Sequence, residues 1–81
     1  MKFVDIGAGN MVLDQRIVAL VTPDSAPAKR IVSEAKDKGR IIDCTGGRKT
    51  KTVIITDSDH VILSYLSCEV LGERLNLDKK D

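Results

Sequence analysis

Apolar and polar residues alternate in short blocks along the first quarter of the chain, and these blocks predict strands. Residues 1–6 form a short strand-like run that stops at residues 7–10, Gly-Ala-Gly-Asn, a composition suited to a tight turn. A second apolar run occupies residues 11–13. Residues 17–21, Ile-Val-Ala-Leu-Val, form a continuous and largely β-branched segment, which is typical of a buried strand.

The pattern then changes to the spacing of an amphipathic helix. Pro23 disfavours a helix before it, whereas Asp24 or Ser25 can cap a helix after it. Pro27 fits the first helical turn because its missing N–H is not needed there, and Gly39 is placed to end the helix. The expected apolar face consists of Ala28, Ile31, Val32 and Ala35.

Three further strand-like runs follow, at residues 41–45, 51–56 and 61–65. Short polar connections join them, the first through Gly-Gly-Arg-Lys and the second through residues 57–60, Asp-Ser-Asp-His. Connections of this length favour antiparallel hairpins, because a parallel return requires a crossover of a dozen or more residues. A meander of three antiparallel strands is therefore expected.

The end of the chain predicts a second helix. Ser67 can cap it, and Leu66 and Leu71 can pack together around that cap as a hydrophobic staple. The predicted architecture is α+β, a small antiparallel sheet with two helices. It forms a single domain over residues 1–77, followed by a frayed tail at 78–81.

The small size of the chain predicts self-association. A domain of 81 residues buries only about 60% of its unfolded surface, so disulfides, metal ions or oligomerisation usually supplement its core. Cys44 and Cys68 have no CxxC spacing and are interpreted as buried free thiols. His60, the single histidine, has no partner at metal-ligand spacing. We therefore expect no metal and no cofactor. Of the three ways to supplement the small core, self-association is the one that remains.

Charge is segregated along the chain, although its formal net value is only +1. Residues 29–51 carry eight Lys or Arg and three acids, a local net charge of +5. Residues 1–28 and 52–81 carry net charges of −1 and −3. A polarised surface of this kind indicates a polyanionic partner at the basic part.

The centre of the basic part is the predicted loop Thr45–Thr50. Two glycines allow a sharp turn and a close approach to a ligand, and Arg48 and Lys49 would lie at the exposed tip. Arginine can fork onto a phosphate or a guanine edge, whereas lysine offers a compact charge suited to phosphate. The alternative is a solvated basic hairpin without a partner. Arg16, before residues 17–21, is by itself an ordinary strand-end arginine.

Several classes of function are disfavoured by composition. Phe3 and Tyr65 are the only aromatic residues, which argues against an aromatic platform for single-stranded nucleic acid. No apolar run approaches the ~20 residues that span a bilayer, so a cytoplasmic protein is expected. Residues 57–60 and 7–10 are interpreted as turns, because neither has the partners of a metal, acid–base or dinucleotide site. The alternative for Asp57 or Asp59 is an ion pair with a basic group of a neighbouring subunit. An enzyme acting on a small-molecule substrate is not expected.

The chain resembles the RemA-type extracellular matrix regulatory proteins, small bacterial DNA-binding activators of biofilm matrix genes. The residues that carry the resemblance span nearly the whole domain: 6–10, 16–17, 25–30, 46–50 and 57–64. The resemblance implies a regulator of transcription that binds double-stranded DNA. It also implies self-association into ring-like homo-oligomers built from a dimer similar to LytTR-type DNA-binding domains.

The resemblance further implies DNA contacts by Arg16 and by a basic pair at Arg48 and Lys49. Arg16 and Arg48 match the family pattern, whereas Lys49 stands where arginine is favoured and Gly46-Gly47 replaces an aromatic-glycine pair. Lys49 keeps the attraction to phosphate but loses bidentate geometry. Three further candidate contacts come from the basic segment: Lys51, Lys29 and Arg30. The alternative functions are a nucleoid- or RNA-binding protein without sequence selection and a protein-interaction module.

Overall fold

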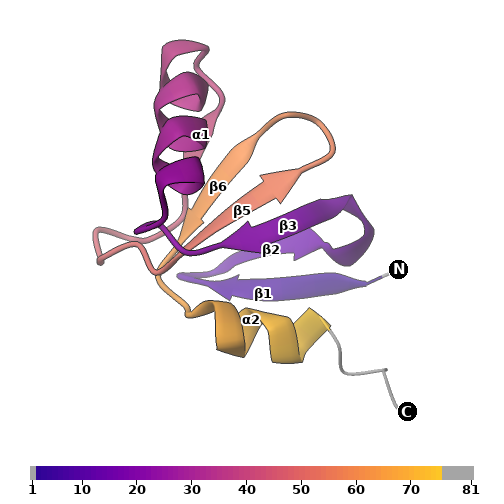
Figure 1. Cartoon of the computed structure of the whole chain (residues 1–81). Helices are drawn as coiled ribbons and strands as arrows, with labels where there is room; N and C mark the ends of the chain where they lie inside the picture. Colours follow the sequence, from indigo (N-terminus) through magenta and orange to yellow (C-terminus); the bar gives the residue numbers. More distant parts are fainter. Residues whose placement is uncertain (1, 76–81) are drawn as a thin grey trace.

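The computed structural model describes residues 2–75, in which six strands, a 3-10 turn and two α-helices follow one another (Figure 1). In chain order they are β1 (Phe3–Gly7), β2 (Asn10–Leu13), η1 (Asp14–Arg16), β3 (Ile17–Val21), α1 (Ala26–Asp37), β4 (Ile41–Asp43), β5 (Thr52–Thr56), β6 (Val61–Ser64) and α2 (Cys68–Leu75). The expected frayed tail at 78–81 lies outside the described residues. The predicted α+β class is confirmed.

The strands form two sheets rather than one. Strands β1 and β2 pair as an antiparallel hairpin, and the other four form a sheet in the order β3-β5-β6-β4. Strands β5 and β6 hold the central positions, and most of their residues are buried. Their apolar sequences suit positions covered on both faces.

One strand pairing differs from the expected meander. Strand β4 does not pair with β5; it pairs in parallel with β6, with Ile41 opposite Val61. The crossover rule applies to the whole connection between two parallel strands, and residues 44–60, which include β5, make that connection. The three-residue β4, half-exposed at Ile41 and exposed at its other two positions, is left at the sheet edge.

The four-stranded sheet has a core on each face. On one face, α1 packs on β4 and β6 and contributes Ala35 to a cluster with Val53 and Val61. On the other face, β1–β2 and α2 enclose a second cluster that includes Ile6, Ile54 and Leu71. Figure 1 shows α1 above the sheet and α2 below β1. Neither helix within residues 2–75 is long and apolar enough to cross a membrane.

The predicted helix caps are confirmed. The hydroxyl of Ser25 accepts a hydrogen bond from the Ala28 amide at 3.2 Å, and Pro27 lies in the first turn of α1. In α2, the Ser67 hydroxyl accepts from the Val70 amide at 3.1 Å. Each cap satisfies an amide that the helix itself leaves without a partner. Gly39 follows α1 with a φ of +68°.

Two buried hydroxyl groups form hydrogen bonds that link the central strands β5 and β6 to β1 and to the segment before α2. The Ser64 hydroxyl donates to the Ile6 carbonyl at 2.8 Å, which joins β6 to β1. The Thr52 hydroxyl donates to the Leu66 carbonyl at 2.7 Å, which joins the start of β5 to the segment before α2. Both residues are fully buried, so these bonds fix the relative positions of the elements at that end of β5.

The two thiols differ in exposure. Cys44 is buried, as predicted, and burial raises the pKa of its thiol. Cys68, at the start of α2, is half-buried and therefore more exposed than the sequence suggests. Both are free thiols.

Candidate nucleic-acid interface

The basic residues singled out by sequence fall at two opposite ends of β5. Lys51 immediately precedes this strand, and Asp57 immediately follows it. At about 3.3 Å per residue, the two positions are roughly 20 Å apart. We define the open end by Lys29, Arg30, Arg48, Lys49 and Lys51, and the paired end by Arg16, Arg40, Asp57 and Asp59. Figure 1 shows the loop before β5 and the turn after it on opposite sides.

The loop at the open end is built on a tight turn. The Asp43 carboxylate accepts hydrogen bonds from the Thr45 amide at 2.9 Å and from the Thr45 hydroxyl at 2.7 Å. The Arg48 amide donates to the Thr45 carbonyl at 3.2 Å. Gly46 and Gly47 between them have φ values of +65° and +86°, as a type I′ turn requires. Thr45 is buried, so the base of the loop is anchored while Arg48 is exposed.

The hydrogen bonds at this turn also affect the carboxyl group that supports it. The Thr45 hydroxyl, together with the Thr45 amide, lowers the pKa of Asp43 below its ordinary value, because both donors favour the ionised form. Asp43 therefore accepts hydrogen bonds from the loop as a carboxylate at neutral pH.

The Arg48 side chain rests on an aromatic ring. Its guanidinium carbon lies 4.5 Å from the centroid of the Tyr65 ring, which follows β6. The ring also lies against Gly7 at the end of β1: a Cβ atom at that position would lie 2.8 Å from Cε2 of Tyr65. Gly7 also has a φ of +101°, which other residues rarely adopt. The ring therefore connects the β1–β2 turn with the basic loop.

The remaining cations of the open end are exposed. Lys49 and Lys51 belong to the loop, and Lys29 and Arg30 lie in the first half of α1. Figure 1 shows that this half of the helix lies on the same side of the molecule as the loop. Within residues 2–75, none of the five cations of the open end has a carboxylate within ion-pair distance.

At the paired end, each arginine has a carboxylate partner. Arg16 Nε donates to Asp57 Oδ1 at 2.8 Å, and the Asp57 amide donates to the Arg16 carbonyl at 3.0 Å. Arg40 Nη1 donates to Asp59 Oδ2 at 3.2 Å. The two aspartates belong to the turn between β5 and β6, as expected for residues 57–60. Their partners are in the same chain, whereas the sequence had also left open a pairing with a neighbouring subunit.

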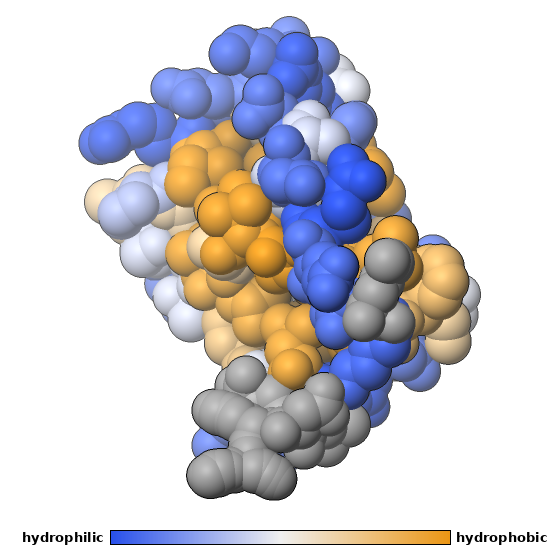
Figure 2. All heavy atoms as spheres, turned by 90° about the vertical axis from the view of Figure 1, so that its right-hand side faces the viewer, coloured by the Kyte–Doolittle hydropathy of each residue, from blue (hydrophilic) through white to orange (hydrophobic). Residues whose placement is uncertain are grey.

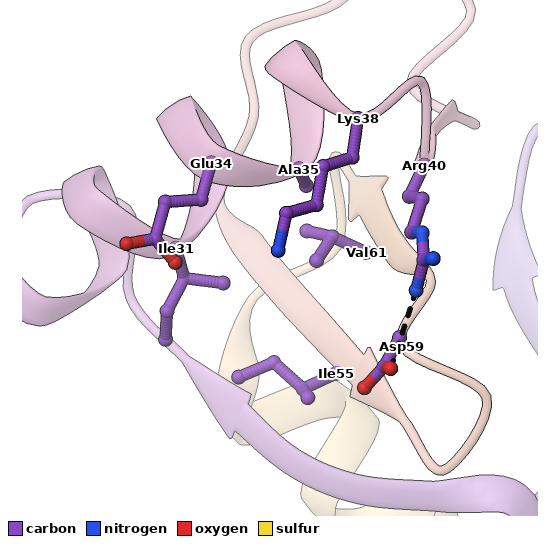
Figure 3. Close-up of a pocket in the computed structure, with 8 residues that line it drawn as sticks. All are labelled: Ile31, Glu34, Ala35, Lys38, Arg40, Ile55, Asp59 and Val61. Atoms are coloured by element: carbon purple, nitrogen blue, oxygen red, sulfur yellow. Dashed lines mark hydrogen bonds and ion pairs between the residues drawn. The ribbon is translucent and has the colours of Figure 1, made fainter.

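A shallow groove borders the paired end. It has a volume of about 230 Å³ and lies between α1 and the β5–β6 hairpin (Figure 3). Its floor is apolar, and charged residues of both signs form its edge: Glu34, Lys38, Arg40 and Asp59. The charges on this side are therefore balanced, unlike those of the open end. Within residues 2–75, no three His, Cys, Asp or Glu side chains are grouped in a way that could hold a metal ion.

Two contacts at these sites could not be found from the sequence. Tyr65 and Arg48 belong to different segments, and the scarcity of aromatic residues had argued against a role for stacking. Asp57 is 41 residues from Arg16, and the sequence did not indicate that these two residues pair. In each case the sheet order brings the partners together, and no local motif marks them.

Comparison with known proteins identifies the family. Residues 3–75 match the family model described as RemA-like, extracellular matrix regulatory protein A-like. A protein of Geobacillus thermodenitrificans is 57% identical over 75 residues, which cover 93% of this chain and 86% of that protein. A protein of Carboxydothermus hydrogenoformans is 58% identical over 76 residues, covering 94% and 87%. Both bear the name "Putative regulatory protein". The chain therefore belongs to the RemA-like family of extracellular matrix regulatory proteins.

Proposed function

We propose that this protein is a non-enzymatic, oligomeric regulator of transcription that binds double-stranded DNA, with the open end as its main contact surface. The observation that carries the proposal is the contrast in charge pairing. Five exposed cations, three in the loop before β5 and two in the first half of α1, lie on one side of the molecule without a carboxylate partner among residues 2–75 (Figure 1), whereas Arg16 and Arg40 on the other side are paired. Unpaired cations on one surface attract the phosphate backbone of a duplex.

Each cation of the open end has a role that follows from its chemistry. Arg48 presents a planar group that can fork onto a phosphate or a guanine edge. Lys49 and Lys51 supply compact charges to phosphates, and Lys29 and Arg30 extend the basic surface along α1. Contacts of this kind are expected to position the duplex more than to select its sequence.

Arg16 contributes a second contact at the paired end. Asp57 accepts a hydrogen bond from Nε, and the terminal amino groups of the guanidinium donate no hydrogen bond to a carboxylate among residues 2–75. A phosphate can approach those groups while Asp57 keeps its bond. The separation of roughly 20 Å between the two ends means that Arg16 and Arg48 contact different stretches of DNA backbone.

Self-association completes the proposed activity. A few phosphate contacts per protomer give weak affinity at physiological salt, whereas repeated copies bind with avidity that exceeds a single site by roughly 10² to 10⁴. Large apolar side chains are exposed at Phe3 and Met11 of the β1–β2 hairpin and at Val18 and Ile42 on the two edge strands of the larger sheet, where further copies could pack. Figure 2, which views the molecule from the paired end, shows apolar surface bordered by hydrophilic residues. We expect a ring-like homo-oligomer, located in the cytoplasm with the nucleoid.

Sedimentation of the purified protein with and without a labelled duplex, over a series of salt concentrations, tests the proposal. We expect a discrete oligomer whose log affinity falls with log salt by about 0.9 for each phosphate contact. The double substitution Arg48→Ala and Lys49→Ala should weaken binding by about 10²-fold, because each lost charge-assisted hydrogen bond costs about 1.5 kcal/mol or more. Lys36→Ala, which removes an exposed lysine in the last turn of α1, is the control for loss of a positive charge elsewhere on the surface.

The outcomes separate the proposal from its alternatives. A monomer indifferent to DNA would contradict it and favour a protein-interaction module. Equal competition by a promoter fragment, a random duplex and structured RNA would instead indicate a nucleic-acid-binding protein without sequence selection. Loss of binding by the double variant with an unchanged oligomer, and normal binding by Lys36→Ala, would support the open end as the contact surface.

A further inference from the structure

The contact between Arg48 and Tyr65 suggests a role for the aromatic ring in ligand binding. Arg48 is the only arginine of the loop, and the Tyr65 ring lies 4.5 Å from its guanidinium carbon. A cation over the face of an aromatic ring is attracted by the negative charge density of that face. Unlike a carboxylate, the ring has no formal charge, so the arginine keeps its full positive charge toward a partner.

The contact with the ring also leaves the donors of the guanidinium available. The N–H groups lie at the edge of this planar group, and the ring face has no oxygen or nitrogen atom that would accept from them. In residues 2–75 the Arg48 side chain has no carboxylate partner, so its donors remain available to an incoming anion. A long arginine side chain loses much rotamer freedom when it binds, and a ring that already orients it reduces this cost.

Hydrogen bonds of its neighbours in the sequence fix the position of Tyr65. The hydroxyl of Ser64 donates to the Ile6 carbonyl at 2.8 Å and accepts from the Leu66 amide at 3.0 Å. These bonds anchor the backbone immediately before and after Tyr65. Gly7 lacks a side chain and therefore leaves room for the edge of the Tyr65 ring. Tyr65 is therefore fixed by the core of the domain rather than by the loop that it supports.

We propose that Tyr65 is a positioning residue for Arg48, which holds the guanidinium in an orientation ready to bind a phosphate of duplex DNA. The inference rests on the proposed function, because it assigns a support to one of its contacts. Tyr65 touches Arg48 and does not itself need to touch DNA. Its contribution to affinity should therefore disappear when Arg48 is removed.

A double-mutant cycle tests this dependence. Tyr65→Leu removes the ring face and keeps an apolar side chain, and Tyr65→Phe keeps the ring and removes only the hydroxyl. Tyr65→Leu should weaken duplex binding two- to fivefold, the factor that corresponds to an exposed cation–π contact. Tyr65→Phe should bind as the unmodified protein does. Adding Tyr65→Leu to Arg48→Ala should cause no further loss, whereas adding it to Arg16→Ala should multiply the two effects.

A spectroscopic signal separates positioning from general support of the fold. In the unmodified protein and in Tyr65→Phe, the ring current should shift the Arg48 Nε–H resonance away from that of an unstacked arginine. In Tyr65→Leu the shift should be lost, while the Arg16 Nε–H resonance in the same spectrum stays unchanged. Tyr65→Met, with an unbranched side chain that adapts to irregular space, serves as the second non-aromatic variant if Tyr65→Leu does not fold.

The results distinguish this inference from the proposed function. If Arg48→Ala weakens binding while Tyr65→Leu and Tyr65→Met have no effect, the positioning role is wrong and the DNA contact stands. Additive losses from Tyr65→Leu and Arg48→Ala would also contradict positioning. If Arg48→Ala leaves duplex affinity unchanged, the contact itself is wrong.

Discussion

The arginines at the two ends of β5 have different kinds of partner. At the paired end, Arg16 and Arg40 each meet an aspartate from the β5–β6 turn, at 2.8 and 3.2 Å. At the open end, Arg48 meets the ring of Tyr65. A carboxylate cancels the charge that a guanidinium offers to a partner, whereas a ring leaves it uncancelled. The comparison teaches that the partner of each cation, rather than the number of cations, decides where a polyanion can bind.

The two ends differ in how available their arginines are to a phosphate. The ion pairs at the paired end add little to the stability of the fold. Exposed ion pairs contribute about 0–1 kcal/mol, because solvent screens both charges and two long side chains must be ordered. Arg16 and Asp57 are each about half exposed, so a phosphate can compete for the arginine at small cost. The paired end is therefore a weaker site for anions than the open end.

Charge reversal at each end should show the largest contrast. Arg48→Glu places a carboxylate among unpaired cations and removes a phosphate contact, so duplex affinity should fall about 10²-fold or more. Arg40→Glu makes the same change in net charge at the paired end and should weaken binding far less. Fluorescence anisotropy of a labelled duplex at fixed salt measures both. Similar losses would show that only the total charge of the protein matters.

Removing the carboxylate beside Arg16 should raise the affinity for duplex DNA, whereas charge reversal at Arg48 should lower it. Asp57→Asn retains an oxygen that can accept from Arg16 Nε and removes the negative charge that competes with phosphate. Duplex affinity should rise two- to fivefold, the factor that corresponds to an exposed ion pair. Asp59→Asn, beside Arg40, is the matched control for net charge. A loss of affinity in Asp57→Asn would mean that the carboxylate charge itself is needed to position Arg16.

The turn at the open end should be stable near neutral pH and should weaken in acid, when the Asp43 carboxylate is protonated. Because the folded-state pKa of Asp43 is lowered, the stabilisation it provides is complete above its ordinary value of about 3.8. It is lost as the pH falls through the lower folded-state value. Hydrogen bonding of the Thr45 amide, followed by NMR, should be constant from pH 5 to 8 and weaken below pH 3.8. Asp43→Asn should abolish this response, and a transition above pH 5 would contradict the assignment.

The smallest effect is expected for stability at the paired end. Asp59→Ala removes the partner of Arg40, and the free energy of unfolding should change by no more than about 1 kcal/mol. Denaturant unfolding of the variant beside the unmodified protein measures the difference. A loss of several kcal/mol would show that the ion pair supports the fold.

Much of the local structure could be predicted from sequence because its causes lie within a few residues. Ser25, Pro27 and Gly39 mark the ends of α1, and the β-branched run 17–21 coincides with β3. The turn at 57–60 follows from its Asp and Ser content. Hydrogen bonds of caps and turns join neighbours in the chain, so the residues themselves specify them.

The order of the sheet could not be predicted in the same way. The short connections around β5 suggested hairpins on both sides, but β6 pairs with both β5 and β4. This choice depends on which strands bury the most apolar surface, a property of the assembled sheet. The family resemblance named Arg16 and Arg48 as contacts, yet it contained nothing about their separation across β5.

By itself, the sequence determined the α+β class, the capped helices, the family and the presence of a basic loop, because capping, periodicity and local charge act over a few neighbouring residues. Only the tertiary structure decided that Arg16 lies against Asp57 and Arg48 against Tyr65. Those contacts join distant segments, and they depend on the order in which the strands pack. The charge available to a partner is therefore decided by packing, although the charged residues are written in the sequence.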